Sequence, residues 1–132
     1  MTGLDTNVLV RYLTLDDPRQ STHATELIEG AARSGEPLFV SGVVMCELVW
    51  VLAGAYGHRK PDIIAALEAL LRAAQLRFAD PARLWGALAD YRDGEADFAD
   101  YLIGRVGADA GCSTTATFDR ALKGNPQFTL LA

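Results

Sequence analysis

The chain has little that would cross-link it or hold it in a membrane. It carries two cysteines, Cys46 and Cys112, in 132 residues, and these form neither a disulfide framework nor a Cys-x-x-Cys site. No basic segment followed by an apolar core opens the sequence. The longest apolar run, residues 42–55, contains Glu47 and is shorter than the ~20 residues that cross a bilayer. These absences predict a soluble, cytoplasmic protein with no membrane association.

Positive charge and histidine are also scarce. The net charge is −5, and the basic residues are ten arginines and two lysines. This balance argues against non-specific coating of nucleic acid, but it allows a nuclease whose acidic metal site contributes much of the charge. Both histidines, His23 and His58, are expected at the surface. The sequence therefore indicates neither a zinc cluster nor a metal-free ribonuclease that uses histidine.

Short apolar segments alternate with helical segments along the chain. The predicted strands end at Asp5 or span residues 37–40, 76–79, 112–115 and 128–131. The predicted helices span residues 8–13, 18–34, 42–54, 61–74, 81–93 and 96–110, with a helical turn at 118–123. Asn7 is predicted to cap the first of these helices. Apolar strands that alternate with helices are typical of parallel sheets. We therefore predict one α/β domain, residues 1–132, with a central, mostly parallel sheet of four to five strands and helices on both faces.

Glu47 is the most unusual residue. Nine of the ten residues at positions 43–52 are apolar, and every neighbour three or four positions from Glu47 is apolar. A helix that is apolar all round is expected to be buried, and a buried carboxylate must be neutral, paired or bound to a cation. We expect Glu47 to face other carboxylates around a metal ion.

Other acidic residues fall at or just past predicted strand ends, where ligands bind in parallel sheets. Asp5 ends the first strand, Asp97 and Asp100 share one helix face, and Asp119 follows a hydroxyl-rich strand. Each has a structural alternative: Asp5 and Asp119 as turn residues, and Asp97 as a helix N-cap. Asp100 lies one turn inside its helix, where capping needs it less, so it is favoured as a ligand.

Several carboxylates close together repel one another unless a cation is present. Oxygen donors without a cysteine or histidine cluster favour Mg²⁺ or Mn²⁺, and such an ion suits phosphodiester hydrolysis. Two alternatives stay open. One is a phosphatase-like domain with Asp5 as nucleophile, although Asn7 stands where the haloacid-dehalogenase pattern has a second aspartate. The other is a non-catalytic metal-binding interaction domain.

Four acidic motifs, in order along the chain, resemble the PIN domain, and within it the VapC-type toxins of bacterial type II toxin–antitoxin pairs. They are residues 5–13 (DTNVLVRYL), the helix with Glu47, residues 97–103 (DFADYLI) and residues 117–120 (TFDR). The resemblance implies a three-layer PIN-like fold and a Mg²⁺-dependent endoribonuclease, with Mn²⁺ as substitute, that cuts structured RNA such as tRNA or rRNA. It also implies a homodimer inhibited by a cognate antitoxin.

The resemblance also assigns roles to residues. It implies that the catalytic acids are Asp5, Glu47, Asp100 and Asp119, and that the same four and Asp97 hold the metal. The residues expected to shape the pocket are Thr6, Asn7 and Thr117. Three arginines are candidates for phosphate contacts or for pairing with the carboxylates: Arg11, Arg105 and Arg120. The glycine-rich, basic segment 53–61 is either a mobile clamp near the substrate or an ordinary turn between helices.

Overall fold

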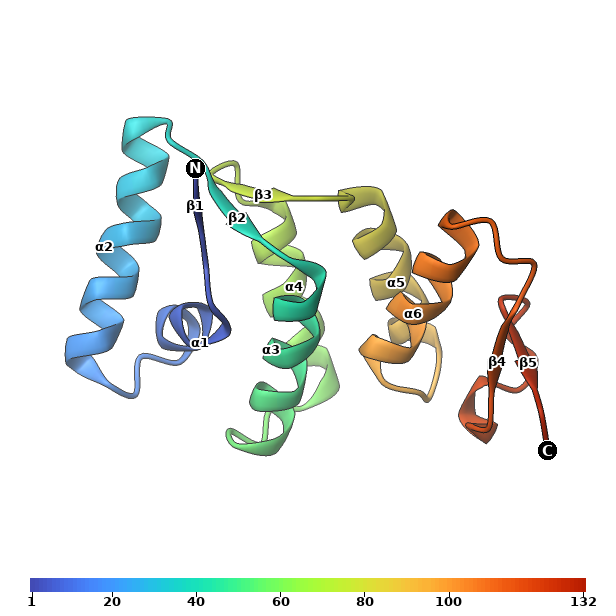
Figure 1. The fold of residues 1–132 in the computed structure, drawn as a ribbon. Coiled ribbons are helices and arrows are strands. Elements are labelled where there is room, and N and C mark those ends of the chain that lie inside the picture. The colour runs from blue at the N-terminus through green and yellow to red at the C-terminus, as the bar shows by residue number, and fades with distance from the viewer. The chain divides into compact units, whose positions relative to one another are not determined.

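The computed structural model describes residues 1–132, which divide into two compact units, Met1–Ala79 and Asp80–Ala132 (Figure 1). The first unit contains β1 (Thr2–Gly3), α1 (Thr6–Thr14), α2 (Pro18–Ser34), β2 (Leu38–Val40), α3 (Gly42–Gly54), α4 (Lys60–Arg72) and β3 (Leu76–Phe78). The second contains α5 (Pro81–Asp93), α6 (Phe98–Asp109), β4 (Thr115–Thr117), the 3-10 turn η1 (Arg120–Leu122) and β5 (Phe128–Leu130).

The first unit is built on a parallel sheet of order β1-β2-β3, in which β2 rather than β1 is central. Leu38 and Val40 of β2 are buried. Helix α1 packs against α2 and α3, and α3 packs against α4. Apolar side chains from all four helices fill the core, and the most deeply buried are Leu9, Ile28, Met45, Leu48, Leu52, Ile63 and Leu67.

Local capping explains where these helices begin and end. Asp17 accepts a hydrogen bond from Gln20 N at 3.1 Å, and Pro18 occupies the first position of α2. Gly35 closes α2 in the left-handed region at φ 75°. The predicted bounds of α2 are confirmed. The prediction that Asn7 caps the first helix is wrong, because Asp5 caps α1 and Asn7 lies inside its first turn.

The second unit pairs α5 with α6 and β4 with β5. The rings of Tyr91 and Phe98 meet edge to face at 6.1 Å between centroids, which packs the end of α5 against the start of α6. The predicted strand at 112–115 is shifted, because Cys112 N donates to Gly107 O at 3.0 Å and Gly111 turns at φ 97°. These contacts close α6, so β4 begins only at Thr115.

The α/β class is confirmed, because the chain combines helices with five strands and every strand pair is parallel. The strands form a three-stranded sheet in the first unit and a two-stranded sheet in the second, rather than the single sheet of four to five strands that was predicted. No helix combines the length and apolar character needed to cross a membrane.

Candidate functional site

Thr6 links two of the predicted catalytic acids in the first unit. Its backbone N–H donates to Asp5 Oδ1 at 2.7 Å, and its hydroxyl donates to Glu47 Oε1 at 2.9 Å. Thr6 is buried, whereas both carboxylates are exposed. The first turn of α1 therefore holds Asp5 by its N-cap geometry and orients Glu47 on α3. Asp5 and Glu47 both contact Thr6, a residue that was predicted only to shape the pocket.

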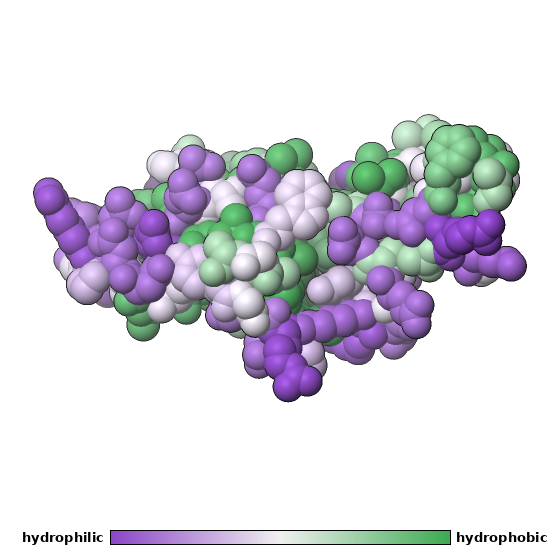
Figure 2. Space-filling view, turned by 90° about the horizontal axis from the view of Figure 1, so that it is seen from below, coloured by the Kyte–Doolittle hydropathy of each residue, from purple (hydrophilic) through white to green (hydrophobic).

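The expected burial of Glu47 is wrong. Val43 is 70% exposed and Trp50 is 54% exposed, and these residues lie four positions before and three positions after Glu47 on α3. Apolar residues reach the surface beside hydrophilic ones on the face drawn in Figure 2. The opposite face of α3 packs inward through Val44, Met45, Leu48, Val49 and Leu52. Helix α3, apolar apart from Glu47 along residues 43–52, thus has one buried row and one exposed row of side chains, and Glu47 lies on the exposed row.

Asn7 and Arg11 lie on the outer side of α1. With Val8, Gln20 and residues of α2 they line a groove of about 270 Å³, whose remaining lining residues are His23, Ala24 and Leu27. Asn7 is exposed, and its side chain faces this groove rather than capping a helix.

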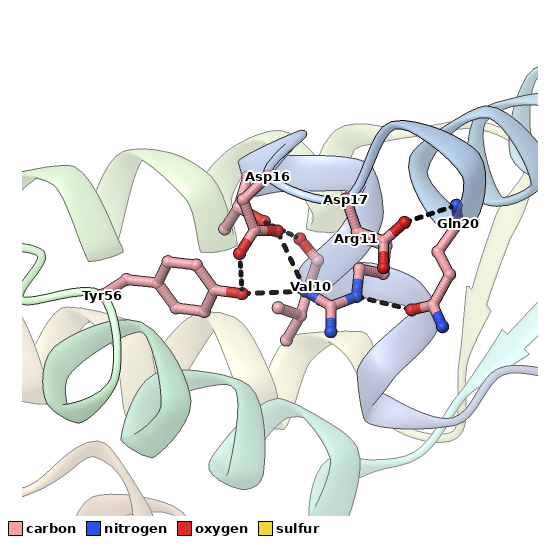
Figure 3. A network of polar contacts seen from close by, with 7 residues as sticks. Val10, Arg11, Asp16, Asp17, Gln20 and Tyr56 are labelled. Carbon is pink, nitrogen blue, oxygen red and sulfur yellow. Dashed lines mark hydrogen bonds and ion pairs between the residues drawn. The ribbon is translucent and has the colours of Figure 1, made fainter.

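Arg11 belongs to a polar network that joins three segments of the first unit (Figure 3). Its guanidinium donates to Asp16 Oδ1 at 2.9 Å, to the hydroxyl of Tyr56 at 3.1 Å and to Gln20 Oε1 at 2.7 Å. The Tyr56 hydroxyl in turn donates to Asp16 Oδ2 at 2.7 Å. Arg11 therefore pairs with a carboxylate outside the predicted acid set. Tyr56 ties segment 53–61 to the turn before α2, which favours an anchored turn over a mobile clamp.

The second unit brings together the other three acids. Asp97 and Asp100 form a capping box at the start of α6, in which Asp97 N–H donates to Asp100 Oδ2 at 3.2 Å. The expectation that Asp100 has little capping use is therefore wrong. Burial raises the pKa of the Asp100 carboxyl, and the charges of Asp119 and Asp97 raise it further, while a backbone hydrogen bond from the Asp97 segment lowers it.

Asp119 is positioned by its own loop. Its Oδ1 accepts a hydrogen bond from Ala121 N at 2.9 Å, which caps η1, and its N–H donates to Thr117 Oγ1 at 3.0 Å. Asp119 thus has the predicted turn role. In that position its charge still acts on the carboxyl of Asp100. Thr117, predicted to shape the pocket, holds the backbone of the acid.

Arg105 is committed to an ion pair within the second unit. Its Nε and Nη2 donate to the two carboxylate oxygens of Asp90, each at 2.9 Å. A side chain on Gly86 would collide with this guanidinium, since an added Cβ would lie 2.7 Å from Arg105 Nη1. Arg105 therefore joins α6 to α5 and does not pair with the predicted acids. Arg120 is exposed beside Asp119 in the chain.

The donor set suits a hard cation. All five predicted ligands are carboxylates, and Asp100 is crowded by two like charges that a cation would offset. Asp5, Asp97 and Asp119 are the N-cap residues of α1, α6 and η1. Neither unit by itself gathers three or more histidine, cysteine or acidic side chains closely enough to hold a metal ion.

A comparison of the chain with protein families matches the PIN domain over residues 4–126. The chain belongs to the PIN-domain family. It is also 27% identical over 120 residues to a protein named VapC ribonuclease from Aquifex aeolicus (strain VF5), covering 91% of this chain and 88% of the relative. The resemblance inferred from the four motifs is thus confirmed at the level of the family and extends to a VapC protein.

Proposed function

We propose that this chain is a metal-dependent endoribonuclease, the toxin of a type II toxin–antitoxin pair, that hydrolyses phosphodiester bonds in structured RNA such as tRNA or rRNA. In this proposal the two units make one PIN-like ribonuclease domain. The observation that carries it is the grouping of the acids in a PIN-family chain: Asp5 and Glu47 around Thr6, and Asp100 with Asp119 and Asp97.

The catalytic roles fall to carboxylates whose positions are set by the chain itself. Thr6 orients Glu47 through a hydrogen bond from a buried hydroxyl. The N-terminus of α6 holds Asp100, and the cap of η1 holds Asp119. A group held by such contacts needs no reorganisation when substrate binds. We assign proton transfer from the attacking water to these acids, with Glu47 and Asp119 as the candidates.

Asp5 and Asp100 are the residues we assign to direct binding of Mg²⁺, or Mn²⁺ as substitute, with Glu47, Asp119 and Asp97 nearby. When bound, the ion would lower the pKa of a water and offset negative charge that develops on the phosphate. Of the three candidate arginines, Arg120 is the one we assign to the RNA backbone, because Arg11 and Arg105 already pair with Asp16 and Asp90.

The relative's name, VapC ribonuclease, supports an antitoxin partner for this chain. We propose that a cognate antitoxin covers the acidic groups in the cytoplasm and that the free toxin is a homodimer. Val43 and Trp50, exposed on the same row of α3 as Glu47, provide apolar surface beside a carboxylate that a partner segment would cover.

The test is cleavage of purified total RNA by the full chain with Mg²⁺, with Mn²⁺ and with EDTA. Asp100→Asn serves as the inactive control, because asparagine can still accept the capping hydrogen bond from Asp97 N–H. We expect discrete fragments that require the metal and that disappear in the variant. Cleavage that persists in EDTA or in Asp100→Asn would contradict the proposal.

The partner proposal has a separate test. The toxin is expressed alone and together with a candidate antitoxin, and growth, complex formation and mass in solution are measured. We expect growth arrest that the partner relieves and a dimeric mass for the isolated toxin. A nuclease without any neutralising partner would leave the enzymatic proposal standing and remove the toxin assignment.

A further inference from the structure

The face of α6 that carries two predicted metal ligands continues into two glycines. Asp97, Asp100, Gly104 and Gly107 follow one another at intervals of three, four and three residues, so they form one row along the helix. Gly104 is buried. Glycine inside a helix is unfavourable relative to alanine. Backbone conformation does not require glycine at these two positions, because neither residue has a positive φ. Their role therefore lies in what packs against them.

The two strands of the second unit touch the helix backbone at these glycines. A Cβ added to Gly104 would lie 2.6 Å from Cε2 and 2.7 Å from Cζ of Phe128 on β5, and 3.1 Å from Gln127 Oε1. A Cβ added to Gly107 would lie 2.7 Å from Thr115 Oγ1 on β4. Real side chains do not approach so closely, so a methyl group at either position would require the facing side chain, Phe128 or Thr115, to move.

The same strands determine where Asp119 stands. Thr117, the last residue of β4, accepts a hydrogen bond from Asp119 N at 3.0 Å, and its carbonyl accepts one from Leu131 N, just after β5, at 2.9 Å. The path from the contact at Phe128 to the Asp119 carboxylate is thus short and hydrogen-bonded. A displacement of β5 from α6 would carry Asp119 away from Asp100.

We infer that Gly104 is a positioning residue for the acidic site: its missing side chain lets Phe128 rest on α6 and so sets the spacing between the carboxylates of Asp119 and Asp100. Gly107 plays the same part, more weakly, because Thr115 can turn its hydroxyl away. The inference rests on the proposed function for its catalytic meaning, since that spacing matters only if both acids serve one metal.

The test compares the full chain with Gly104→Ala, with Phe128→Leu, and with the double variant G104A/F128L. Leucine lacks the two ring atoms that the new methyl group would meet. We expect G104A to bind Mn²⁺ about tenfold or more weakly, as is usual when a residue that orients metal ligands is changed. We expect the double variant to return toward the wild-type affinity. Gly30→Ala on α2 is the matched control, because its nearest neighbour would be an ordinary contact with Arg33 Nη2 at 3.8 Å.

A purely structural role for Gly104 would give a different result. In that case G104A would melt at a lower temperature, yet the folded protein would bind Mn²⁺ as tightly as the wild type, and the inference would be overturned. Failure of the double variant to recover Mn²⁺ affinity would overturn it as well. Should G104A not fold, Gly107→Ala, whose added methyl group would meet only Thr115 Oγ1, carries the comparison with a smaller expected loss of Mn²⁺ affinity.

Failure of the proposed function is recognised separately. If the wild type itself binds no Mn²⁺, the metal-dependent nuclease is excluded. The contact between Gly104 and Phe128 is then tested through the amide NMR shifts of Asp100 and Asp119 in the metal-free protein. Movement of both amides in G104A, with recovery in G104A/F128L, supports the positioning contact, and unchanged amides reject it.

Discussion

The hydroxyl of Thr6 donates a hydrogen bond to Glu47 across 2.9 Å, joining residues 41 positions apart in the chain. The backbone N–H of the same threonine donates to Oδ1 of Asp5, the N-cap of α1, at 2.7 Å. One buried residue therefore orients two carboxylates, Asp5 at the start of α1 and Glu47 on α3. A substitution that removes only its hydroxyl tests the effect on Glu47 separately from the effect on the fold.

Thr6→Val is expected to reduce RNA cleavage about 10–100-fold, in the range seen when a residue that orients a metal ligand is lost. Valine has nearly the shape of threonine but cannot donate to Glu47. The loss of this hydrogen bond is expected to cost about 1 kcal/mol of unfolding free energy. Cleavage rates and chemical denaturation measure the two effects. Thr6→Ser keeps the hydroxyl and should keep most activity; equal losses in both variants would mean that the methyl contact, not the hydrogen bond, matters.

Asp100→Asn is expected to stabilise the metal-free protein at neutral pH while abolishing cleavage. The pKa of Asp100 is raised in the folded state, so the folded protein binds this proton more tightly than the unfolded chain does. Stability from this group is therefore present at low pH and lost as pH rises through the folded pKa. Melting temperatures of the wild type and the variant, measured without metal, should converge as pH falls toward the ordinary value of 3.8. A gap that widens instead would contradict the assigned sign.

Addition of Mn²⁺ should reverse that order. A ligand that binds only the folded state raises stability by RT ln(1 + [L]/Kd), about 2.7 kcal/mol at a concentration of one hundred times Kd. The wild type should therefore gain thermal stability with Mn²⁺, and Asp100→Asn should gain much less. Removal of the metal with EDTA should restore the original melting curves. Equal gains in both proteins would show that Asp100 is not a ligand.

Tyr56→Phe is expected to destabilise the first unit more at neutral pH than at acid pH. The hydrogen bond from Tyr56, followed by those from Thr14 and Arg11, lowers the pKa of Asp16 in the folded state, although partial burial opposes this. Stability from Asp16 is thus present above its ordinary pKa of 3.8 and is lost as pH falls through the lowered value. An NMR titration of the Asp16 carboxyl in the variant should give a higher pKa than in the wild type. An unchanged pKa would remove Tyr56 from the network.

Arg105→Lys is expected to lower the unfolding free energy by about 1 kcal/mol or less, because lysine cannot form the two parallel bonds to Asp90. If Arg105 serves structure rather than RNA, KM for cleavage should stay unchanged. Arg120→Lys provides the comparison, since the proposal assigns that exposed arginine to the RNA backbone. A rise in KM for Arg105→Lys alone would reassign the phosphate contact.

The limits of helices α2, α3 and α5 were predictable, because the caps Asp17 and Ser41 and the opening proline of α5, Pro81, act within a few residues. The predicted limits of the strand at 112–115 were wrong, because the contact of Cys112 with Gly107 that delays this strand depends on how α6 ends. Asn7 was assigned the cap that Asp5 provides. Both residues can cap a helix, and only the path of the backbone chooses between them.

By itself the sequence determined the α/β class, the parallel pairing and the chain's membership of the PIN family, because periodicity, caps and acidic motifs are local or ordered along the chain. The tertiary structure alone decided that Glu47 lies on an exposed row of α3, that Thr6 holds it, and that Arg11 and Arg105 pair with Asp16 and Asp90. It also decided that Gly104 faces Phe128. Which face of a helix is covered, and which distant group meets a charge, depends on the packing of whole elements, and no pattern within a single segment specifies that.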